Sequence, residues 1–478
     1  MFFNSLHFLA FFPVVVGLYL ATPARLRWLL LLAASYYFYA AWRVEYLLLI
    51  IVSTLIDYVA GLAMDSTADP KRKRLFLILS LFSNLGILFS FKYFNFFNES
   101  LRAVFGVFSV PYEIPGFDVL LPVGISFYTF QTLSYTIDVY RGHRSAERHL
   151  GIFALYVAFF PQLVAGPIER STRLLPQFLK KADVSYDRAV DGLRLMLWGF
   201  FKKLVIADRL AIYVDAVYSQ PGDHAAATIL LATYFFAFQI FCDFSGYSDI
   251  AIGSARILGY DLMDNFNRPY FAKSIGEFWR RWHISLSTWF RDYLYIPLGG
   301  NRVTKRRWYY NLFMVFLISG LWHGANWTFV VWGALHGAYL IVGIVSQEWR
   351  DRFCAAVGIR GKTRRWIAAA VTFHLVVISW IFFRADNIHD AGLLFAGLLD
   401  FGSFDLILPV FGRYDLLLAF GSILILEIVH FLERRQHFRH FLDSRPAFVR
   451  WVIYYAFTMS ILLFGVINQK QAFIYFQF

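Results

Sequence analysis

Long apolar runs separated by short basic loops dominate this chain. Four runs lie near residues 7–20, 28–41, 46–63 and 75–94, and a last one lies near residues 451–467. Several of them approach the roughly 20 residues that an α-helix needs to cross a bilayer. The apolar residues are continuous and do not alternate with polar ones, which disfavours a membrane β-barrel. The pattern therefore predicts an all-α, polytopic integral membrane protein.

Two segments between these runs are too polar to cross a membrane. Residues 166–187 contain prolines and a lysine pair, and residues 265–307 are rich in aromatic and basic side chains. Such segments are either interfacial helices or backbone that is buried inside the protein. A polar loop is expected over residues 98–118.

The domain organisation follows from the absence of a repeat or a flexible linker in the sequence. The simplest interpretation is a single membrane domain over residues 1–478. Within it we expect N-terminal helices in residues 1–150, a catalytic core in residues 151–345, and C-terminal helices with an extracytoplasmic aromatic tail in residues 346–478. Residues 1–20 lack a positive n-region and are expected to remain as the first span.

Composition and charge agree with a membrane protein. Hydrophobic residues make up 59% of the chain and charged residues only 16%, against roughly 25% charged residues in a soluble domain. The net charge of +13 would also suit a nucleic-acid-binding protein. However, the basic residues cluster in short loops beside apolar runs, where they set membrane orientation. Cytoplasmic basic loops would place both termini outside. Cys242 and Cys354 are expected to be unpaired thiols.

His323 lies in an apolar stretch near residues 308–345. An ionisable side chain at membrane depth is costly and marks a candidate functional site. Its ordinary pKa, about 6.5, suits proton transfer near neutral pH. A histidine that only forms hydrogen bonds between helices explains the single residue about equally well. His336 fits a structural role better. Small residues flank both histidines, and they would allow close helix packing or leave room for a substrate.

Asp243 and Asp249 lie in another apolar run, together with three hydroxyl side chains. The two acids are six residues apart, so on an unbroken helix they point in different directions. Gly246 lies between them and is a candidate helix break. The acids could line a substrate tunnel, or they could neutralise arginines elsewhere in the core, and both interpretations stay open.

Residues 265–302 combine asparagine, arginine, tryptophan and histidine. On a helix, Trp279 and His283 would share a face at i, i+4, and so would Glu277 and Arg281. Arginine beside tryptophan is typical of an interfacial anchor. That explanation accounts least well for His283.

Several common catalytic motifs do not occur in the sequence. There is no HExxH, no CxxC, no GxSxG, no P-loop and no GxGxxG in a βαβ setting. This disfavours a metal hydrolase, an α/β-hydrolase and a nucleotide-driven pump, and it predicts no metal site. The last six residues are aromatic and apolar apart from Tyr475 and one glutamine. Packing of an apolar tail explains the phenylalanines but not the hydroxyl group of Tyr475.

In this order, the motifs resemble the membrane-bound O-acyltransferase superfamily. The resemblance covers nearly the whole chain. It is carried by residues 34–40, 121–128, 135–142 and 160–168, and most specifically by residues 243–253, 265–302 and 321–337. It implies a ring of transmembrane and re-entrant helices around a central tunnel that holds the histidine. It also implies transfer of an acyl group from a thioester, usually acyl-coenzyme A, to a hydroxyl or amine.

The resemblance also implies residue roles. His323 would be the central catalytic histidine, a neutral general base for a hydroxyl that attacks the thioester; burial should keep it neutral. His283 would occupy a second polar position. His283, Asn267 or tryptophan N–H groups could stabilise the oxyanion. Tyr475 resembles the tyrosine in the terminal aromatic motif of the small membrane partner of the related D-alanyl transfer system. By that resemblance it would accept the acyl group and present it to an extracytoplasmic transferase. The residues expected to line the substrate or tunnel are Asp243, Ser245, Tyr247, Asn267, Arg280, Trp282 and Trp322.

These expectations describe an inner-membrane O-acetyltransferase without a bound cofactor. It would take acetyl from acetyl-coenzyme A or another cytoplasmic acyl thioester and deliver it across the membrane for O-acetylation of an exported polysaccharide. The resemblance favours an alginate-like polymer, with cellulose or peptidoglycan as alternatives. Expected partners are the donor, membrane lipid and an extracytoplasmic polysaccharide acetyltransferase, with no nucleic acid. The alternatives are a D-alanyl or other acyl transferase for a cell-wall polymer, a proton-coupled transporter, for which no inverted repeat is visible, and a passive scaffold.

Overall fold

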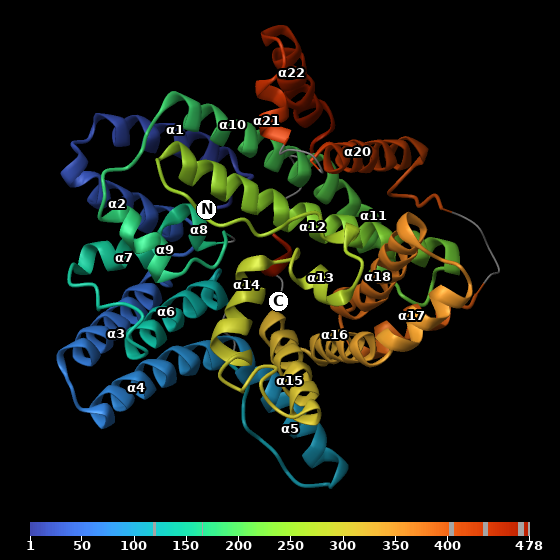
Figure 1. Cartoon of the computed structure of the whole chain (residues 1–478), viewed down its shortest axis with the longest axis horizontal. Coiled ribbons are helices and arrows are strands. Elements are labelled where there is room, and N and C mark those ends of the chain that lie inside the picture. Colours follow the sequence, from blue (N-terminus) through green and yellow to red (C-terminus); the bar gives the residue numbers. More distant parts are fainter. Residues whose placement is uncertain (118–120, 165, 401–405, 434–437, 467–472, 477–478) are drawn as a thin grey trace. The chain divides into compact units, whose positions relative to one another are not determined.

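Helices joined by short turns make up the computed structural model, which describes residues 1–117, 121–164, 166–400, 406–433, 438–466 and 473–476 (Figure 1). No β-strand occurs within those ranges. Among them, seven helical segments are long and apolar enough to cross a membrane: Leu47–Ser66, Pro70–Val107, Ala226–Ile257, Trp327–Val345, Gly361–Arg384, Arg413–Leu432 and Ala447–Phe464. The expectation of an all-α polytopic membrane protein is confirmed.

The chain divides into two compact units. The first comprises Met1–Leu193 and Ile250–Met263, and the second comprises Arg194–Asp249 and Asp264–Phe478. All the candidate site residues named above belong to the second unit. The single membrane domain and the ring of helices around a tunnel stay predictions.

The first unit begins with helices at the apolar runs of the sequence, of which only the third and the fourth are among the candidate spans. These are α1 (Leu6–Ala21), α2 (Arg27–Ala40), after the short η1 (Ala24–Leu26), and α3 (Leu47–Ser66), followed by α4 (Pro70–Leu88). Asp57 on α3 accepts hydrogen bonds from Ser80 Oγ (2.6 Å) and Asn84 Nδ2 (2.8 Å) on α4. Hydrogen bonds of this kind join helices inside a membrane, where the hydrophobic effect does not.

The loop expected over residues 98–118 is partly wrong. Helix α4 continues through η2 (Phe89–Tyr93) into α5 (Phe94–Val107). The polar side chains that suggested a loop instead hold the following segment against α5. Asn98 Nδ2 and Arg102 Nη2 both donate to Ile114 O, at 3.1 and 2.7 Å. Side-chain donors thus satisfy backbone carbonyls that have no helical partner.

The first unit continues with further helices. They are α6 (Ile125–Tyr140), α7 (Leu150–Ala158), α8 (Phe160–Leu163) and α9 (Ser171–Phe178), and α10 (Tyr186–Phe200) begins there. In the polar segment 166–187, Glu169 is fully buried and accepts a hydrogen bond from Met263 N at 2.5 Å. The start of that segment is therefore buried backbone and not an interfacial helix.

In the second unit, α10 continues through η3 (Phe201–Ala207), a wider π-type turn, into α11 (Asp208–Tyr218). Helix α12 (Ala226–Ile257) then runs unbroken through Gly246, so the suggested break is wrong. A Cβ atom at Gly246 would lie 2.8 Å from Gly199 O and 3.2 Å from Lys203 N. The glycine lets η3 approach α12 closely, which matters for the site described below.

Four short elements occupy the polar segment 265–307: η4 (Pro269–Phe271), α13 (Ile275–Trp279), α14 (Ile284–Phe290) and η5 (Arg291–Tyr295). Trp282 and His283 lie between α13 and α14 and are fully buried. Of the two interpretations of this segment, burial within the protein is therefore correct for its middle part.

The apolar stretch around His323 is a hairpin of α15 (Lys305–His323) and α16 (Trp327–Val345) (Figure 1). Asn326 caps α16 by accepting a hydrogen bond from Thr328 N at 3.0 Å. A Cβ atom at Gly320 would lie 2.3 Å from Phe329 O, and one at Gly333 would lie 2.4 Å from Phe316 O. The small residues thus serve close helix packing, one of the two expected uses.

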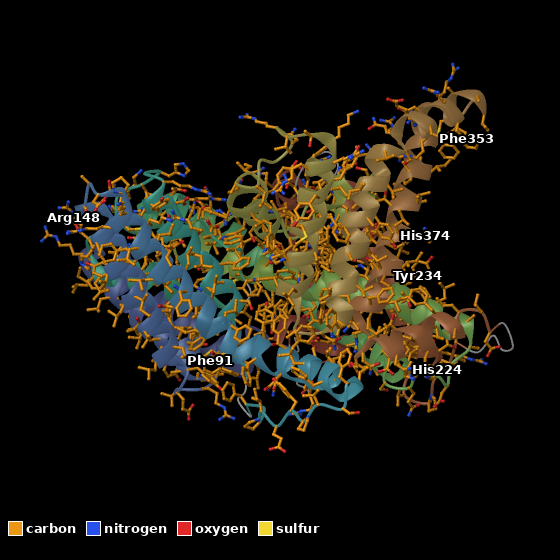
Figure 2. The ribbon with its side chains drawn as sticks, turned by 90° about the horizontal axis from the view of Figure 1, so that it is seen from below. Phe91, Arg148, His224, Tyr234, Phe353 and His374 are labelled. Atoms are coloured by element: carbon orange, nitrogen blue, oxygen red, sulfur yellow. The ribbon has the colours of Figure 1, made fainter. Side chains whose placement is uncertain are left out.

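The rest of the second unit is helical as far as it is described. It comprises α17 (Gln347–Ala356), α18 (Gly361–Arg384), α19 (Ile388–Gly397), α20 (Arg413–Leu432), α21 (Phe438–Asp443), α22 (Ala447–Phe464) and η6 (Ile474–Phe476). Aromatic contacts join α12 to α18, where Tyr234 and His374 meet edge to face with ring centroids 5.9 Å apart (Figure 2). Both cysteines are free thiols, as expected.

Candidate active site

His323 is the last residue of α15 and is only 1% exposed. Its position at the helix end follows from Gly324, whose extended backbone ends α15 before the cap of α16. Four rings surround the imidazole with centroids within 5.5 Å, those of Trp322, Trp332, Phe383 and Tyr475. The apolar rings exclude water from a titratable group, which makes its electrostatic interactions stronger than in water.

His283 is also fully buried, and it reaches the same cluster from the α13–α14 connection. Its ring centroid lies 6.4 Å from that of His323 and 6.1 Å from that of Tyr475. Phe244 of α12 packs edge to face against it at 4.6 Å. Burial lowers the pKa of His283 to about 3, so the imidazole is neutral at physiological pH.

The expectation that Trp279 and His283 share a helical face is wrong. Helix α13 ends at Trp279, and His283 adopts a left-handed backbone conformation with φ 42°. The chain leaves the helix because Asn267 N donates to Arg281 O (2.9 Å) and Ile284 N donates to the Asn265 carbonyl (2.9 Å). The expected pairing of Arg281 with Glu277 does form, at 2.6 Å.

The described part of the tail, residues 473–476, brings Tyr475 to both histidines. Asp243 Oδ2 accepts a hydrogen bond from Ile474 N at 2.7 Å. Phe473 packs against Tyr247 of α12 at 4.6 Å between ring centroids, and Tyr475 packs against Phe244 at 4.7 Å. Burial, and then the nearby Asp243 carboxylate, raise the pKa of the Tyr475 phenol well above its usual range. The phenol therefore keeps its proton unless a base removes it.

Two consecutive lysines of η3 neutralise the two acids of α12. Lys203 Nζ lies 2.6 Å from Asp243 Oδ1 and 2.7 Å from Asp208 Oδ1. Lys202 Nζ lies 2.7 Å from Asp249 Oδ2 and donates to Ser245 Oγ at 2.9 Å. The acids thus do pair with buried cations, but these cations are lysines and not arginines.

Sequence reasoning missed Lys202 and Lys203. The signal was present, because both lysines lie in an apolar stretch between Trp198 and Ile206, and intramembrane cations are candidate functional residues by default. Burial alone would lower the pKa of Lys203, but the adjacent Asp208 and Asp243 carboxylates outweigh it and raise that pKa. Lys203 therefore stays protonated, and its ammonium group holds Asp243 in position to bind the tail.

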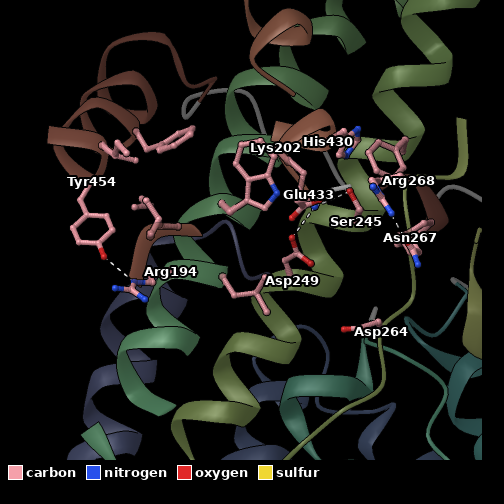
Figure 3. Close-up of a pocket in the computed structure, with 18 of the residues that line it drawn as sticks. Arg194, Lys202, Ser245, Asp249, Asp264, Asn267, Arg268, His430, Glu433 and Tyr454 are labelled. Carbon is pink, nitrogen blue, oxygen red and sulfur yellow. Dashed lines mark hydrogen bonds and ion pairs between the residues drawn. The ribbon is translucent and has the colours of Figure 1, made fainter. Parts of the chain in front are cut away.

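A polar cavity of about 420 Å³ lies beside this cluster within the second unit (Figure 3). Lys202, Ser245 and Asp249 line it, together with Asn267 and Arg268. Further lining residues include Arg194, Asp264, His430, Glu433 and Tyr454.

An aromatic layer separates this cavity from His283. Phe241 and Phe266 line the cavity. Both contact the buried Trp282, at 6.2 and 5.1 Å between ring centroids, and Phe266 contacts Phe244, which packs on His283.

The candidate residues therefore fall into four groups. Trp322, Asp243 and Tyr247 contact the cluster of His283, His323 and Tyr475 or the tail that carries Tyr475, and Trp282 belongs to the aromatic layer. Ser245 and Asn267 line the polar cavity. Arg280 is exposed and lies in neither place.

His336 is held by hydrogen bonds on both ring nitrogens. Trp279 Nε1 donates to Nδ1 at 3.2 Å, and Nε2 lies 3.0 Å from Ser379 Oγ. Since Nδ1 accepts, Nε2 carries the proton and donates to the serine hydroxyl, which itself donates to Val376 O at 2.7 Å. This geometry fits the structural role expected for His336. Among the residues described, no three His, Cys, Asp or Glu side chains gather in a way that could hold a metal ion.

Comparison with known proteins agrees with an all-helical membrane protein. The model of the membrane-bound O-acyltransferase family matches residues 149–383. A probable alginate O-acetylase of Azotobacter vinelandii is 44% identical over 85% of this chain and 79% of its own length. A peptidoglycan O-acetyltransferase of Helicobacter pylori is 37% identical over 78% of this chain and 73% of its own length.

A more distant relative is a teichoic acid D-alanyltransferase of Bacillus subtilis, 27% identical over 58% of this chain and 71% of its own length. The chain belongs to the membrane-bound O-acyltransferase family. It is a multi-pass membrane acyltransferase, which disfavours the transporter and scaffold alternatives.

Proposed function

We propose that this protein is a bacterial inner-membrane O-acetyltransferase that moves acetyl from a cytoplasmic thioester, acetyl-coenzyme A first among the candidates, to an exported polysaccharide. In this proposal Tyr475 is an intermediate acceptor and His323 is the general base. The observation that carries the proposal is the meeting of His283, His323 and Tyr475 in one buried cluster, although they come from three separate parts of the chain.

The transfer step follows from the chemistry of these groups. Tyr475 Oη attacks the thioester carbonyl while neutral His323 takes the phenol proton, because a buried phenol does not ionise by itself. A C–O bond forms, and the C–S bond breaks as the tetrahedral intermediate collapses. His323 returns its proton to the departing thiolate, which leaves as the free thiol. The product is an acetyl ester on Tyr475.

His283 supports the same step as a hydrogen-bond donor. Because burial holds it neutral, one ring nitrogen carries a proton that can stabilise the developing oxyanion, a contribution of about 3–4 kcal/mol for one such donor. Trp322, whose ring centroid is 6.0 Å from that of His283, is a second candidate donor.

The acceptor polymer and the orientation are inferred from relatives and from loop charge. Relatives at 44% and 37% identity are named for O-acetylation of alginate and of peptidoglycan, so we propose an alginate-like polymer, with peptidoglycan or cellulose as alternatives. The basic loops face the cytoplasm and both termini lie outside. A periplasmic polysaccharide acetyltransferase would take acetyl from Tyr475. A D-alanyl donor is the competing proposal.

The test is incubation of the purified protein with [¹⁴C]acetyl-coenzyme A, following free thiol and protein-bound label. Wild type should acquire label that maps to Tyr475. Tyr475→Phe keeps the ring that packs against Phe244 but lacks the nucleophile, so it should acquire none.

The outcomes separate the parts of the proposal. Thioester cleavage without label on Tyr475 would discard the tyrosine relay and keep the acetyltransferase. Label on Tyr475 from D-alanyl thioester, with none from acetyl thioester, would replace the acetyl donor by the competing one.

A further inference from the structure

A second cavity of about 490 Å³ in the same unit is lined mainly by cations. Five of its lining side chains are basic, namely Arg268, Lys273, Arg281, Lys362 and Arg365. Phe271 and Trp366 supply aromatic faces, and no aspartate or glutamate is among the lining residues. Nothing in the proposed transfer step uses this cavity.

The positive charge of the cavity is only partly balanced. Glu277 accepts hydrogen bonds from Arg281 (2.6 Å) and from the Lys273 backbone N–H (2.8 Å). Lys362 and Arg365 form no ion pair within the part of the chain that the structure describes. Walls of a single sign concentrate the field inside a cleft and attract counter-ions.

The start of α18 adds to this field. Lys362 and Arg365 lie in its first turns, which contain no acidic residue, and Arg360 provides no side-chain cap. A helix N-terminus carries partial positive charge, so cations are unfavourable there and an anion is stabilised. A bound anion would stabilise this 24-residue helix in two ways, by pairing with the basic side chains and by interacting with the helix dipole.

Because α18 is a candidate span (Gly361–Arg384) by length and composition and these residues are at its beginning, the cavity would lie at a membrane surface. Trp366 is 59% exposed, as is typical of an aromatic side chain at the headgroup level. Phosphate groups are the anions available there, and arginine binds them through paired N–H groups.

We propose that this cavity is a phosphate-binding site. The bound phosphate could come from two sources. One is the headgroup of an anionic phospholipid. The other is the coenzyme donor, and this source rests on the proposed function. The segment that contributes Arg268 and Arg281 to this cavity also leads to the candidate active site. Arg281 Nη1 donates to Arg268 O at 3.4 Å, and Arg281 O accepts from Asn267 N. Arg268 also lines the 420 Å³ cavity, and His283 follows Arg281 by two residues.

The experiment uses the full chain in nanodiscs and a double variant, Lys362→Gln with Arg365→Gln. The matched control is Arg306→Gln with Arg352→Gln, which removes the same charge from exposed residues outside the cavity. The first arm measures binding of coenzyme A and of pantetheine, which lacks the phosphates, in neutral phosphatidylcholine. The second arm counts phosphatidylglycerol molecules that stay bound to the protein, by native mass spectrometry.

If the coenzyme is the source, the cavity variant should bind coenzyme A about tenfold or more weakly than wild type, with pantetheine binding unchanged. If lipid is the source, the cavity variant alone should lose retained phosphatidylglycerol. The proposal is overturned if the cavity variant matches the control in both arms.

Neither arm requires acetyl transfer, so the two proposals can fail separately. Coenzyme binding that depends on the cavity, without label on Tyr475, would remove the relay and leave this site. Label on Tyr475 together with two unchanged arms would remove this site and leave the relay.

Discussion

The α15–α16 hairpin holds two buried histidines that both lie among aromatic rings, including the shared ring of Trp332, but that differ in their polar neighbours. His336 uses both ring nitrogens in hydrogen bonds, with Trp279 and with Ser379, which fix one tautomer. His323 lies among aromatic rings, beside a phenol that is itself a possible nucleophile. Both residues are at most 1% exposed. Burial alone therefore does not distinguish the two histidines, whereas the phenol beside His323 does.

The largest expected effect is on the reaction at His323. His323→Ala should lower the single-turnover rate of acetyl transfer by about 10²–10⁴-fold, the usual range for a general base. His336→Gln, a histidine change on the same hairpin, is the control and should stay within a few-fold after correction for folded protein. A rate for His323→Ala within threefold of wild type would end its assignment as the base.

The next effect concerns Asp243, which holds the tail beside His323. Asp243→Ala removes the acceptor for Ile474 N–H and one of the two carboxylates on Lys203, so label on Tyr475 should fall and stability should drop by up to about 3–5 kcal/mol. Asp249→Ala is the matched control, because it removes the carboxylate that pairs with Lys202 but leaves the hydrogen bond between Asp243 and the tail intact. Equal loss of label in the two variants would contradict a positioning role for Asp243.

A smaller effect is expected at His336. His336→Leu leaves the Trp279 N–H and the Ser379 hydroxyl without their partner, which should lower the free energy of unfolding by about 1–3 kcal/mol. The thermal unfolding midpoint in detergent measures this. Transfer activity per folded molecule should stay near wild type, and its selective loss would show that His336 takes part in the reaction.

The smallest effect is a pH dependence from His283. Its pKa is about 3 in the folded protein and near 6.5 when unfolded. The unfolded chain therefore binds the proton first, and stability is lost as pH falls from 6.5 toward 3. Between pH 7 and pH 5.7 the loss should be about 1 kcal/mol. His283→Asn should show a correspondingly flatter dependence of its unfolding midpoint on pH, and an unchanged slope would contradict this assignment.

Much of the helical layout could be predicted from hydrophobic length alone. The expected runs near residues 7–20 and 46–63 became Leu6–Ala21 and Leu47–Ser66. The failure after residue 94 has a physical cause. Asn98 and Arg102 look like loop residues, but their side chains bind the Ile114 carbonyl and remain compatible with a helix.

The members of the candidate site could be chosen from the sequence, but their geometry could not. His323 and Tyr475 could be chosen because polar groups are rare in apolar surroundings. His283 lies in a polar segment and could be chosen because an interfacial anchor explains it least well. The left-handed conformation of His283 depends on hydrogen bonds from Asn267 and to Asn265, which no local pattern encodes. The role of Gly246 likewise depends on a second helix, since its packing partner is the carbonyl of Gly199.

The distribution of the cluster along the chain has a consequence for biosynthesis. His283 and His323 are synthesised 40 residues apart, whereas Tyr475 emerges from the ribosome about 150 residues after His323. During that interval the nascent protein can insert its hairpin and enclose both histidines, but it has no phenol to receive an acyl group. Under the proposed relay, a nascent chain in the membrane would thus be unable to load acetyl onto itself, and the competence to do so would arrive only with the segment that carries Tyr475.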